Sequence, residues 1–380
     1  MNATEILARL ISFPTVVGTP NGEIVDWIRT YLQAEDIAVA ILPGPEGDRS
    51  NLFATIGPRD APGYIISGHT DVVPAEHAEW ISTPFSLRRD GERLYGRGAT
   101  DMKGYLAAAL AAAPKLAKAG LARPIHLAFS YDEEAGCRGV PHLIAKLPAL
   151  CAAPLGALIG EPSNMRAVLA HKGKAAASVT VRGRAGHSSR PDLCLNAIHA
   201  MAGVLNAAIE QAERLSVGPF DQAFEPPYSS LQAGVISGGK AINIVPDLCR
   251  LELEARAISG VNPQSLLAPI RKKAEALREA GFSVDWDEMS AYPALALDRS
   301  SPLVALVEDL TNQTALGAVS YGTEAGLYQA AGIDALICGP GDIGRAHKPD
   351  EFILESELVD CQNFIEALGQ RCQASGGRFR

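Results

Sequence analysis

The chain has 380 residues, too many for one ordinary hydrophobic core, which stops growing near ~250–300 residues, so two domains are expected. A hydrophobic content of 47% and a charged content of 20% exclude an intrinsically disordered chain. The net charge of −9 and the lack of long Lys or Arg runs argue against nucleic acid as a partner.

Cysteine usage and the N-terminal residues indicate a cytoplasmic protein. The seven cysteines are scattered and contain no CxxC pair, which argues against a disulfide framework and against a cysteine-based zinc site. The N-terminus lacks the basic region of a signal peptide. No apolar run approaches the ~20 residues of a membrane span, so we expect no membrane partner.

Helices and strands are predicted to alternate over the first 160 residues or so. A helix is expected at 21–35, where isoleucine and leucine recur four residues apart, and a second in the Ala-rich stretch 104–116. Apolar runs predict strands at 51–56, 64–67, 125–131 and 156–159. This alternation favours the α/β class with a mostly parallel central sheet.

The pattern changes from about residue 174 and then returns. Strands are predicted at 175–182, 231–236 and 248–256, with helices at 196–215 and 263–279. Two helices on a small antiparallel sheet predict an inserted α+β domain. Beyond it we expect a helix at 303–314, a strand at 335–338 and a helix from about 355. We therefore predict a discontinuous catalytic domain, 1–173 and 288–380, interrupted by a lid, 174–287.

Side chains capable of chemistry stand where predicted strands end. His69 and Asp71 share one face of a strand end, where ligands of open α/β sheets gather. By itself this short motif is more often a buried structural pair. Asp101 closes a Gly-rich loop before the Ala-rich helix, and it could equally be the N-cap of that helix.

Another strand runs directly into three adjacent carboxylates, at 132–134. Such a triplet is either a solvated acidic turn or a site neutralised by cations. In the second case Glu133 and Glu134 could divide the work, one handling a proton and the other binding metal. Glu161 ends a further strand, and His347 lies in a Gly/Pro-rich loop, where a lone histidine is usually a surface residue.

Together these positions supply two imidazoles and three carboxylates, from His69, Asp101, Glu134, Glu161 and His347. Imidazole and carboxylate without thiolate suit zinc in a hydrolase, with cobalt or manganese as substitutes. Two such ions bridged by Asp101 would leave room for a water whose pKa they lower. The sequence therefore predicts a two-metal hydrolase.

These five motifs, in this order, make the chain similar to the M20 family of metallopeptidases and amidohydrolases over nearly its whole length. The resemblance implies that Asp71 orients His69 and that Glu133 is the general base. It also implies a cis peptide between Asp101 and Met102. The metal ligands that it implies are His69, Asp101 and Glu161 for one ion and Asp101, Glu134 and His347 for the other.

The inserted domain resembles the family's lid and dimerisation domain. The resemblance implies a homodimer in which His187, in the loop 183–191, reaches the partner's active site and stabilises the oxyanion. Asn243 and Arg256 match positions that bind the substrate's α-carboxylate. As alternatives, His187 could cap a loop and Arg256 could be an exposed strand charge. Cys194 stands where the family commonly has glycine, which puts the loop's backbone geometry in question.

Within the family, Thr-Glu-Ala at 323–325 and the Gly-Pro-Gly…Ala-His-x-Pro-Asp-Glu segment at 339–351 resemble the acetylornithine deacetylases. This implies deacetylation of N2-acetyl-L-ornithine in arginine biosynthesis, by a metal-bridged water and a glutamate base. Glu324 would then face the substrate pocket and favour a cationic side chain, or else only stabilise a helix N-terminus.

Three other functions remain open. One is an amidohydrolase acting on another small N-acyl-L-amino acid, such as a relative of succinyl-diaminopimelate desuccinylase, because specificity can depend on a few contacts worth ~1–3 kcal/mol each. Another is a dipeptidase of the same family. A non-catalytic binding protein is disfavoured, because Glu133 and all five ligands are present.

Overall fold

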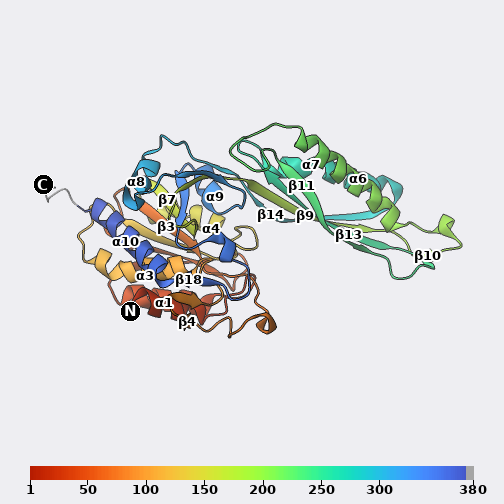
Figure 1. The fold of residues 1–380 in the computed structure, drawn as a ribbon. Helices are drawn as coiled ribbons and strands as arrows, with labels where there is room; N and C mark the ends of the chain where they lie inside the picture. Colours follow the sequence, from red (N-terminus) through yellow and green to blue (C-terminus); the bar gives the residue numbers. More distant parts are fainter. Residues whose placement is uncertain (374–380) are drawn as a thin grey trace. The chain divides into compact units, whose positions relative to one another are not determined.

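The computed structural model describes residues 1–373, apart from the side chain of His77, and consists of two compact units (Figure 1). The first unit comprises Met1–Ala170, Leu295–Gly317 and, among the described residues, 323–373. The second comprises His171–Ala294 and Ala318–Gly322. The first unit is therefore discontinuous in the sequence.

Within the described residues, a nine-stranded sheet forms the centre of the first unit. Its order is β1-β2-β6-β3-β7-β17-β8-β15, and β16 pairs with β8. Strands β6, β3, β7 and β17 are parallel neighbours, whereas β1 runs antiparallel to β2, β2 to β6, and β8 to β17. The strands are β1 (Ala38–Pro43), β2 (Ser50–Ile56), β3 (Tyr64–His69), β6 (Ile125–Ser130), β7 (Gly156–Pro162), β8 (Val168–His171), β15 (Leu295–Ala296), β16 (Leu316–Val319) and β17 (Ala335–Gly339). The predicted α/β class with a mostly parallel central sheet is confirmed.

Helices cover both faces of this sheet. A Cβ on Gly68 of β3 would lie 2.9 Å from Leu106 of helix α3 (Lys103–Ala117). The next side chain back, Ser67, instead contacts Tyr328 of helix α9 (Ala325–Ala330). Because successive strand residues point to opposite faces, α3 and α9 lie on opposite faces. Two-sided cover explains why β6, β7 and β17 are buried at every residue and are largely apolar.

The Ala-rich helix α3 packs against α1 and α10, and the three lie side by side (Figure 1). Its small buried side chains allow this close packing on the main core. The helices of this unit are α1 (Ala3–Ile11), α2 (Gly22–Gln33), α3 (Lys103–Ala117), α4 (Val140–Ile144), α5 (Leu147–Leu150), α8 (Pro302–Thr311), α9 (Ala325–Ala330) and α10 (Glu355–Arg371). A small sheet of order β18-β5-β4 completes the unit, with β4 (Arg88–Asp90), β5 (Arg93–Tyr95) and β18 (Phe352–Leu354).

The second unit contains a four-stranded antiparallel sheet, of order β11-β13-β9-β14, in the described residues. Helices α6 and α7 pack on one face, so alternate residues along β13 are buried. This is the α+β arrangement that the alternating pattern predicts. The elements are β9 (Gly173–Arg182), β10 (Gly186–His187), α6 (Ala197–Ser216), β11 (Ser230–Gly238), β12 (Ile244–Val245), β13 (Leu248–Ala257), α7 (Pro263–Glu275) and β14 (Ser283–Tyr292).

Two differences from the predicted elements have local causes. Helix α7 ends at Glu275 instead of 279, because the last turn tightens into a 3-10 helix (Ala276–Ala280) that stops at Gly281, whose φ is 88°. Strand β14 was not predicted, since charged and polar residues interrupt its apolar alternation. The other 3-10 helices are His77–Glu79, Pro191–Leu193 and Ile343–Arg345. No helix of the described part of the chain is long and apolar enough to cross a membrane.

Candidate metal centre

Three neighbouring parallel strands deliver polar side chains to one edge of the large sheet. His69 is the last residue of β3, Glu161 lies near the end of β7, and the triplet 132–134 follows β6 by one residue. Strands β6, β3 and β7 are adjacent, so their carboxyl ends meet. Two groups of side chains could each hold a metal ion, because the possible ligand atoms within each group lie within 4.8 Å of one another. One group is His69, Glu133 and Glu161, and the other is His69, Asp101 and Glu134.

Asp101 lies between two imidazoles. Its Oδ1 is 3.1 Å from His69 Nε2, and its Oδ2 is 3.2 Å from His347 Nε2. His69 Nε2 is also 3.7 Å from Glu161 Oε1, while His347 Nε2 is 3.0 Å from Glu134 Oε1. All five side chains predicted as ligands therefore lie close together, with Asp101 between the two histidines.

The charges of this cluster fit divalent cations. Burial, reinforced by Asp101 and Glu133, raises the pKa of Glu161 well above its usual range. Burial, together with Asp101, raises the pKa of Glu134 to about 6. Burial acts in the same direction on Asp101, but hydrogen bonds from His347 and His69 hold its pKa below the usual range. Crowded carboxylates and imidazoles, without a thiolate, form a donor set suited to zinc, cobalt or manganese.

The alternative role of Asp101 as a helix N-cap is excluded by the geometry. Helix α3 begins at Lys103, and its N-cap is Met102, without a side-chain capping bond. The carboxylate of Asp101 is directed at the histidines instead. The peptide between Asp101 and Met102 is cis. In the preceding loop, Gly98 has a φ of 84°, a conformation that favours glycine.

A buried glutamate that the sequence did not single out holds this loop. Glu351, with 1% of its surface exposed, accepts a bond of 2.8 Å from Arg97 Nη1. It also accepts the backbone N–H groups of Gly98 at 3.0 Å, Thr100 at 2.8 Å and Asp101 at 3.0 Å. Glu351 was visible only as the end of the Pro-Asp-Glu motif, and nothing local indicated its burial.

Asp71 has more partners than its predicted role requires. His69 Nδ1 lies 2.9 Å from the backbone carbonyl oxygen of Asp71 and 3.5 Å from its carboxylate Oδ1. The carboxylate also accepts the backbone N–H of Glu133 at 3.2 Å and that of Glu134 at 3.1 Å. Asp71 thus links the histidine at the end of β3 to the glutamate pair that follows β6.

The acidic triplet is not a solvated turn. Asp132 is 1% exposed and forms an ion pair with Arg49. Glu133 is partly buried, and its Oε1 lies 3.3 Å from the thiol of Cys137. Burial, with further contributions from Glu134 and Glu324, raises the pKa of Glu133 to about 8. A carboxyl with this pKa can exchange a proton near neutral pH.

Glu324 lies beneath the cluster, with 1% of its surface exposed. Its Oε1 accepts a hydrogen bond from Ser130 Oγ, and its Oε2 accepts one of 3.3 Å from Ser67 Oγ. Glu324 stands at the N-cap of α9 but makes no side-chain capping bond. Contact between Glu324 and a cationic substrate group stays a prediction, and the side chain has other partners here.

The remaining predicted site residues belong to the second unit. His187 is exposed, and its Nδ1 lies 2.7 Å from Ser189 Oγ. Asn243 is close to it in the fold, because the pair β10–β12 joins His187 to Ile244. Arg256, near the end of β13, donates to Glu254 Oε1 at 2.8 Å. Arg256 also donates to the Tyr292 hydroxyl at 3.3 Å and is partly buried, so it is not a fully solvated strand charge.

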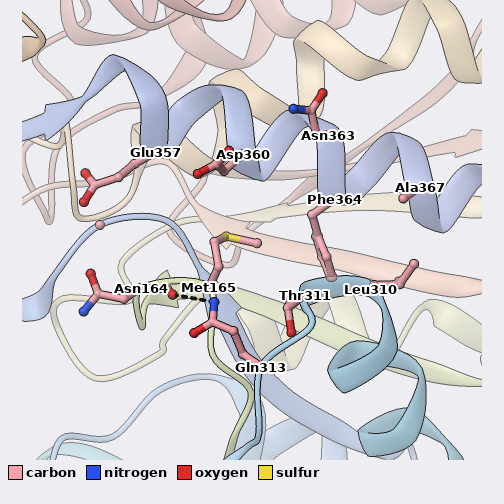
Figure 2. Close-up of a pocket in the computed structure, with 11 residues that line it drawn as sticks. Asn164, Met165, Leu310, Thr311, Gln313, Glu357, Asp360, Asn363, Phe364 and Ala367 are labelled. Carbon is pink, nitrogen blue, oxygen red and sulfur yellow. Dashed lines mark hydrogen bonds between the residues drawn. The ribbon is translucent and has the colours of Figure 1, made fainter.

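A cavity of about 650 Å³ lies elsewhere in the first unit (Figure 2). Its walls come from α10, from the end of α8 and from the chain around Asn164, whose carbonyl oxygen accepts a bond of 3.4 Å from Gln313. The lining includes none of the clustered ligands and no histidine. The cavity thus lacks the acid–base groups found at the strand ends.

Comparison with known proteins gives a consistent result. The model of the peptidase family M20/M25/M40 matches residues 65–371. The acetylornithine deacetylase of Photorhabdus laumondii is 31% identical over 373 residues, covering 96% of this chain and 95% of the relative. That of Proteus mirabilis is also 31% identical, over 386 residues, with the same coverage.

Solved structures share the fold at lower identity. A family M20 metallo-carboxypeptidase from Sulfolobus solfataricus superposes with a TM-score of 0.80 at 18% identity, covering 97% of this chain and 99% of that one. A dinuclear metal-binding peptidase of the same family from Bacillus subtilis has a TM-score of 0.66 at 16% identity, covering 97% and 96%.

Proposed function

This chain belongs to the peptidase family M20/M25/M40, and from that premise we propose that it hydrolyses N2-acetyl-L-ornithine to L-ornithine and acetate, a step of arginine biosynthesis. Membership of the family makes it a hydrolase acting on amide bonds. The observation that carries the proposal is the cluster of two imidazoles and three carboxylates with Glu133 beside it. The choice of substrate is supported by relatives of that name at 31% identity over 96% of the chain.

We assign one divalent ion to His69, Asp101 and Glu161 and a second to Asp101, Glu134 and His347. Zinc is the proposed metal, with cobalt or manganese as substitutes. Bound there, two such ions would polarise the scissile carbonyl and would lower the pKa of a water. The remaining steps are performed by the protein's own side chains.

Glu133 is the proposed general base and acid. Its carboxylate takes a proton as the water oxygen attacks the acetyl carbon, and it returns this proton to the amide nitrogen as the C–N bond breaks. Burial raises the pKa of Glu133 above the usual range of a glutamate, which strengthens its carboxylate as a base. The bond from its backbone N–H to Asp71 holds the residue in place.

The second unit supplies the proposed lid and dimerisation domain. His187 would donate a hydrogen bond to the oxyanion that forms on the acetyl carbonyl. Asn243 and Arg256 would bind the α-carboxylate, for which a guanidinium is well shaped. His187 is exposed at the end of the short strand β10, which suits a residue that serves the other subunit of a homodimer.

The location that we propose is the cytoplasm. All seven cysteines are free, including five that are buried. Free thiols persist in a reducing compartment, whereas oxidising compartments favour disulfides.

Steady-state kinetics on a substrate panel with defined zinc tests the proposal. The panel contains N2-acetyl-L-ornithine, N-acetyl-L-norvaline, N-succinyl-L,L-diaminopimelate and Ala-containing dipeptides. We expect the highest kcat/KM on acetylornithine, and we expect Glu133→Gln to lower kcat by ~10²–10⁴-fold. A preference for a neutral, a succinylated or a dipeptide substrate would reject the ornithine assignment in favour of a related hydrolase, without changing the mechanism.

A further inference from the structure

Glu324 connects the two strands that carry the reacting groups. Its Oε2 accepts a hydrogen bond from Ser67 Oγ at 3.3 Å, and its Oε1 accepts one from Ser130 Oγ. Ser67 precedes His69 by two residues on β3, and Ser130 is the last residue of β6, three before Glu133. The carboxyl therefore spans β3 and β6 immediately before the candidate metal centre.

The contact of Glu324 with the two serines lies on the same face of the sheet as His69. Ser67 and His69 project on the same face of β3, because they are two residues apart along a strand. In the register of the β3–β6 pair, His69 lies directly beside Ser130. Tyr328 of α9 adds a further contact, with its hydroxyl 3.0 Å from Ser67 Oγ. Glu324 and helix α9 thus pack against the ends of β3 and β6, next to His69.

The surroundings of Glu324 leave little room for a substrate contact. Both of its carboxyl oxygens have a serine hydroxyl as partner, and only 1% of the residue is exposed. A cationic side chain would have to displace those hydroxyls and enter the buried layer between β3, β6 and α9. Such a move costs the desolvation of the cation as well as two hydrogen bonds.

We infer that Glu324 is a positioning residue, whose carboxyl ties the ends of β3 and β6 together and so sets the position of His69 relative to Glu133. The inference rests on the proposed function of Glu133 as the base. It differs from a role in substrate choice, because a positioning residue affects all substrates alike. It acts through Ser67 and Ser130 and touches neither substrate nor metal.

Two substitutions at this position separate the roles. Glu324→Ala removes both hydrogen bonds, and a displacement of about 1 Å at the reacting groups lowers kcat by ~10²-fold with little change in KM. Glu324→Gln keeps an acceptor oxygen and offers an amide donor to the second hydroxyl. Burial raises the pKa of Glu324 to about 7, so a neutral side chain is a close match. We expect Glu324→Gln to retain kcat within about tenfold.

The decisive comparison uses N2-acetyl-L-ornithine and N-acetyl-L-norvaline, which has the same side-chain carbons without the amine. Positioning predicts equal fold-losses in kcat on both substrates for each variant. A loss confined to kcat/KM for the ornithine substrate would overturn the inference and return Glu324 to substrate recognition. The matched control is Glu366→Ala on α10, which removes the ion-pair partner of Lys115 on α3. It should change kcat on neither substrate.

Cobalt binding tests the inference independently of turnover. If the wild-type protein hydrolyses no acyl amino acid, the proposed function fails, but the absorption bands of bound Co²⁺ still report the ligand geometry. We expect Glu324→Ala to alter these bands and to weaken Co²⁺ binding by ~10-fold or more, and Glu324→Gln to restore both. Unchanged bands and affinity in a folded Glu324→Ala protein would overturn the inference.

Ser130→Ala serves if Glu324→Ala does not fold. It removes one of the two hydroxyl contacts and leaves the glutamate in place. We expect a smaller fall in kcat, of about tenfold, equal on both substrates. Wild-type kinetics and wild-type Co²⁺ bands in Ser130→Ala would contradict the inference.

Discussion

Individual side chains in this protein hold one another in place by long-range hydrogen bonds. Asp71 shows this most directly, because its carboxylate accepts the backbone N–H groups of Glu133 and Glu134, which are 62 and 63 residues away. Its backbone carbonyl lies beside His69 Nδ1, which leaves Nε2 facing Asp101. One aspartate therefore holds His69, Glu133 and Glu134 in place together.

A second buried residue, His126 on β6, has a consequence for stability. Its Nδ1 lies 3.0 Å from Thr55 Oγ1, its ring stacks on Phe53, and its Nε2 has no hydrogen-bond partner among the described residues. Burial lowers the pKa of His126 to about 4. Above pH ~6.5 the ring of His126 is neutral in both the folded and the unfolded chain, so it adds no pH dependence to the free energy of unfolding there.

Between pH ~6.5 and ~4 the unfolded chain takes up a proton on this histidine while the folded chain does not. The folded state should therefore lose up to about 3 kcal/mol over this window, at ~1.4 kcal/mol per pKa unit. We predict that His126→Phe, which keeps a ring against Phe53, loses less stability than the wild type between pH 7.5 and 4.5. Urea unfolding at both pH values measures the difference, and identical losses in the two proteins would contradict it.

At the scale of elements, the conformation of the loop 97–101 depends on its contact with Glu351, a residue distant in the sequence. Glu351 accepts four N–H groups of this loop, and its ion pair with Arg97 is buried on both sides. The loop carries Asp101, which shares its two oxygens between His69 and His347. The shape of a Gly-rich loop is thus set by a residue that lies 250 positions away from Asp101.

Glu351→Gln should be strongly destabilising. The amide offers a single acceptor oxygen to donors that a carboxylate satisfies with two, and it leaves the buried guanidinium of Arg97 without a counter-charge. We expect the free energy of unfolding to fall by about 3 kcal/mol or more, measured by urea titration. Glu366→Gln, on the exposed pair with Lys115, is the control and should cost at most ~1 kcal/mol. Equal losses of unfolding free energy in the two variants would show that the hydrogen bonds of Glu351 to the loop 97–101 add no more stability than the Lys115–Glu366 pair.

For the whole molecule, the second unit presents an open sheet edge. Strand β11 stands at the end of the strand order, and Val235 and Ile236 on it are 50% and 52% exposed. An edge strand with exposed apolar residues is a template for pairing with another chain. This feature supports the proposed homodimer, with β11 as part of the interface.

Ile236→Lys should accordingly weaken dimerisation. A charge on the edge strand disfavours its pairing and burial, which is how soluble proteins protect such edges. We expect sedimentation equilibrium to give a dimer for the wild type and a shift toward monomer for the variant. Ile81→Lys, at an apolar position of the first unit that is 82% exposed, is the control and should leave the mass unchanged. A monomeric wild-type protein would reject the proposal.

Local patterns predicted the helices of ten or more residues and the strands at the centre of both large sheets, whereas shorter elements such as α1, β1 and β8 were not predicted. The apolar runs located β2, β3, β6 and β7, and the Ala-rich stretch located α3, because burial on both faces imposes continuous apolar sequence. Strand β14 escaped prediction, because only part of it is buried and its polar residues hide the alternation.

For the site too, local sequence predicted some features and only the tertiary structure showed the others. Residue chemistry at strand ends and in two loops predicted His69, Asp101, Glu134, Glu161 and His347, and the structure brings these side chains close together. Local sequence could not show that Asp101 serves both histidines, that Glu351 holds its loop or that Glu324 lies between two serines. These contacts join residues up to 257 positions apart, and a buried carboxylate is recognisable as such only when the chain has folded around it.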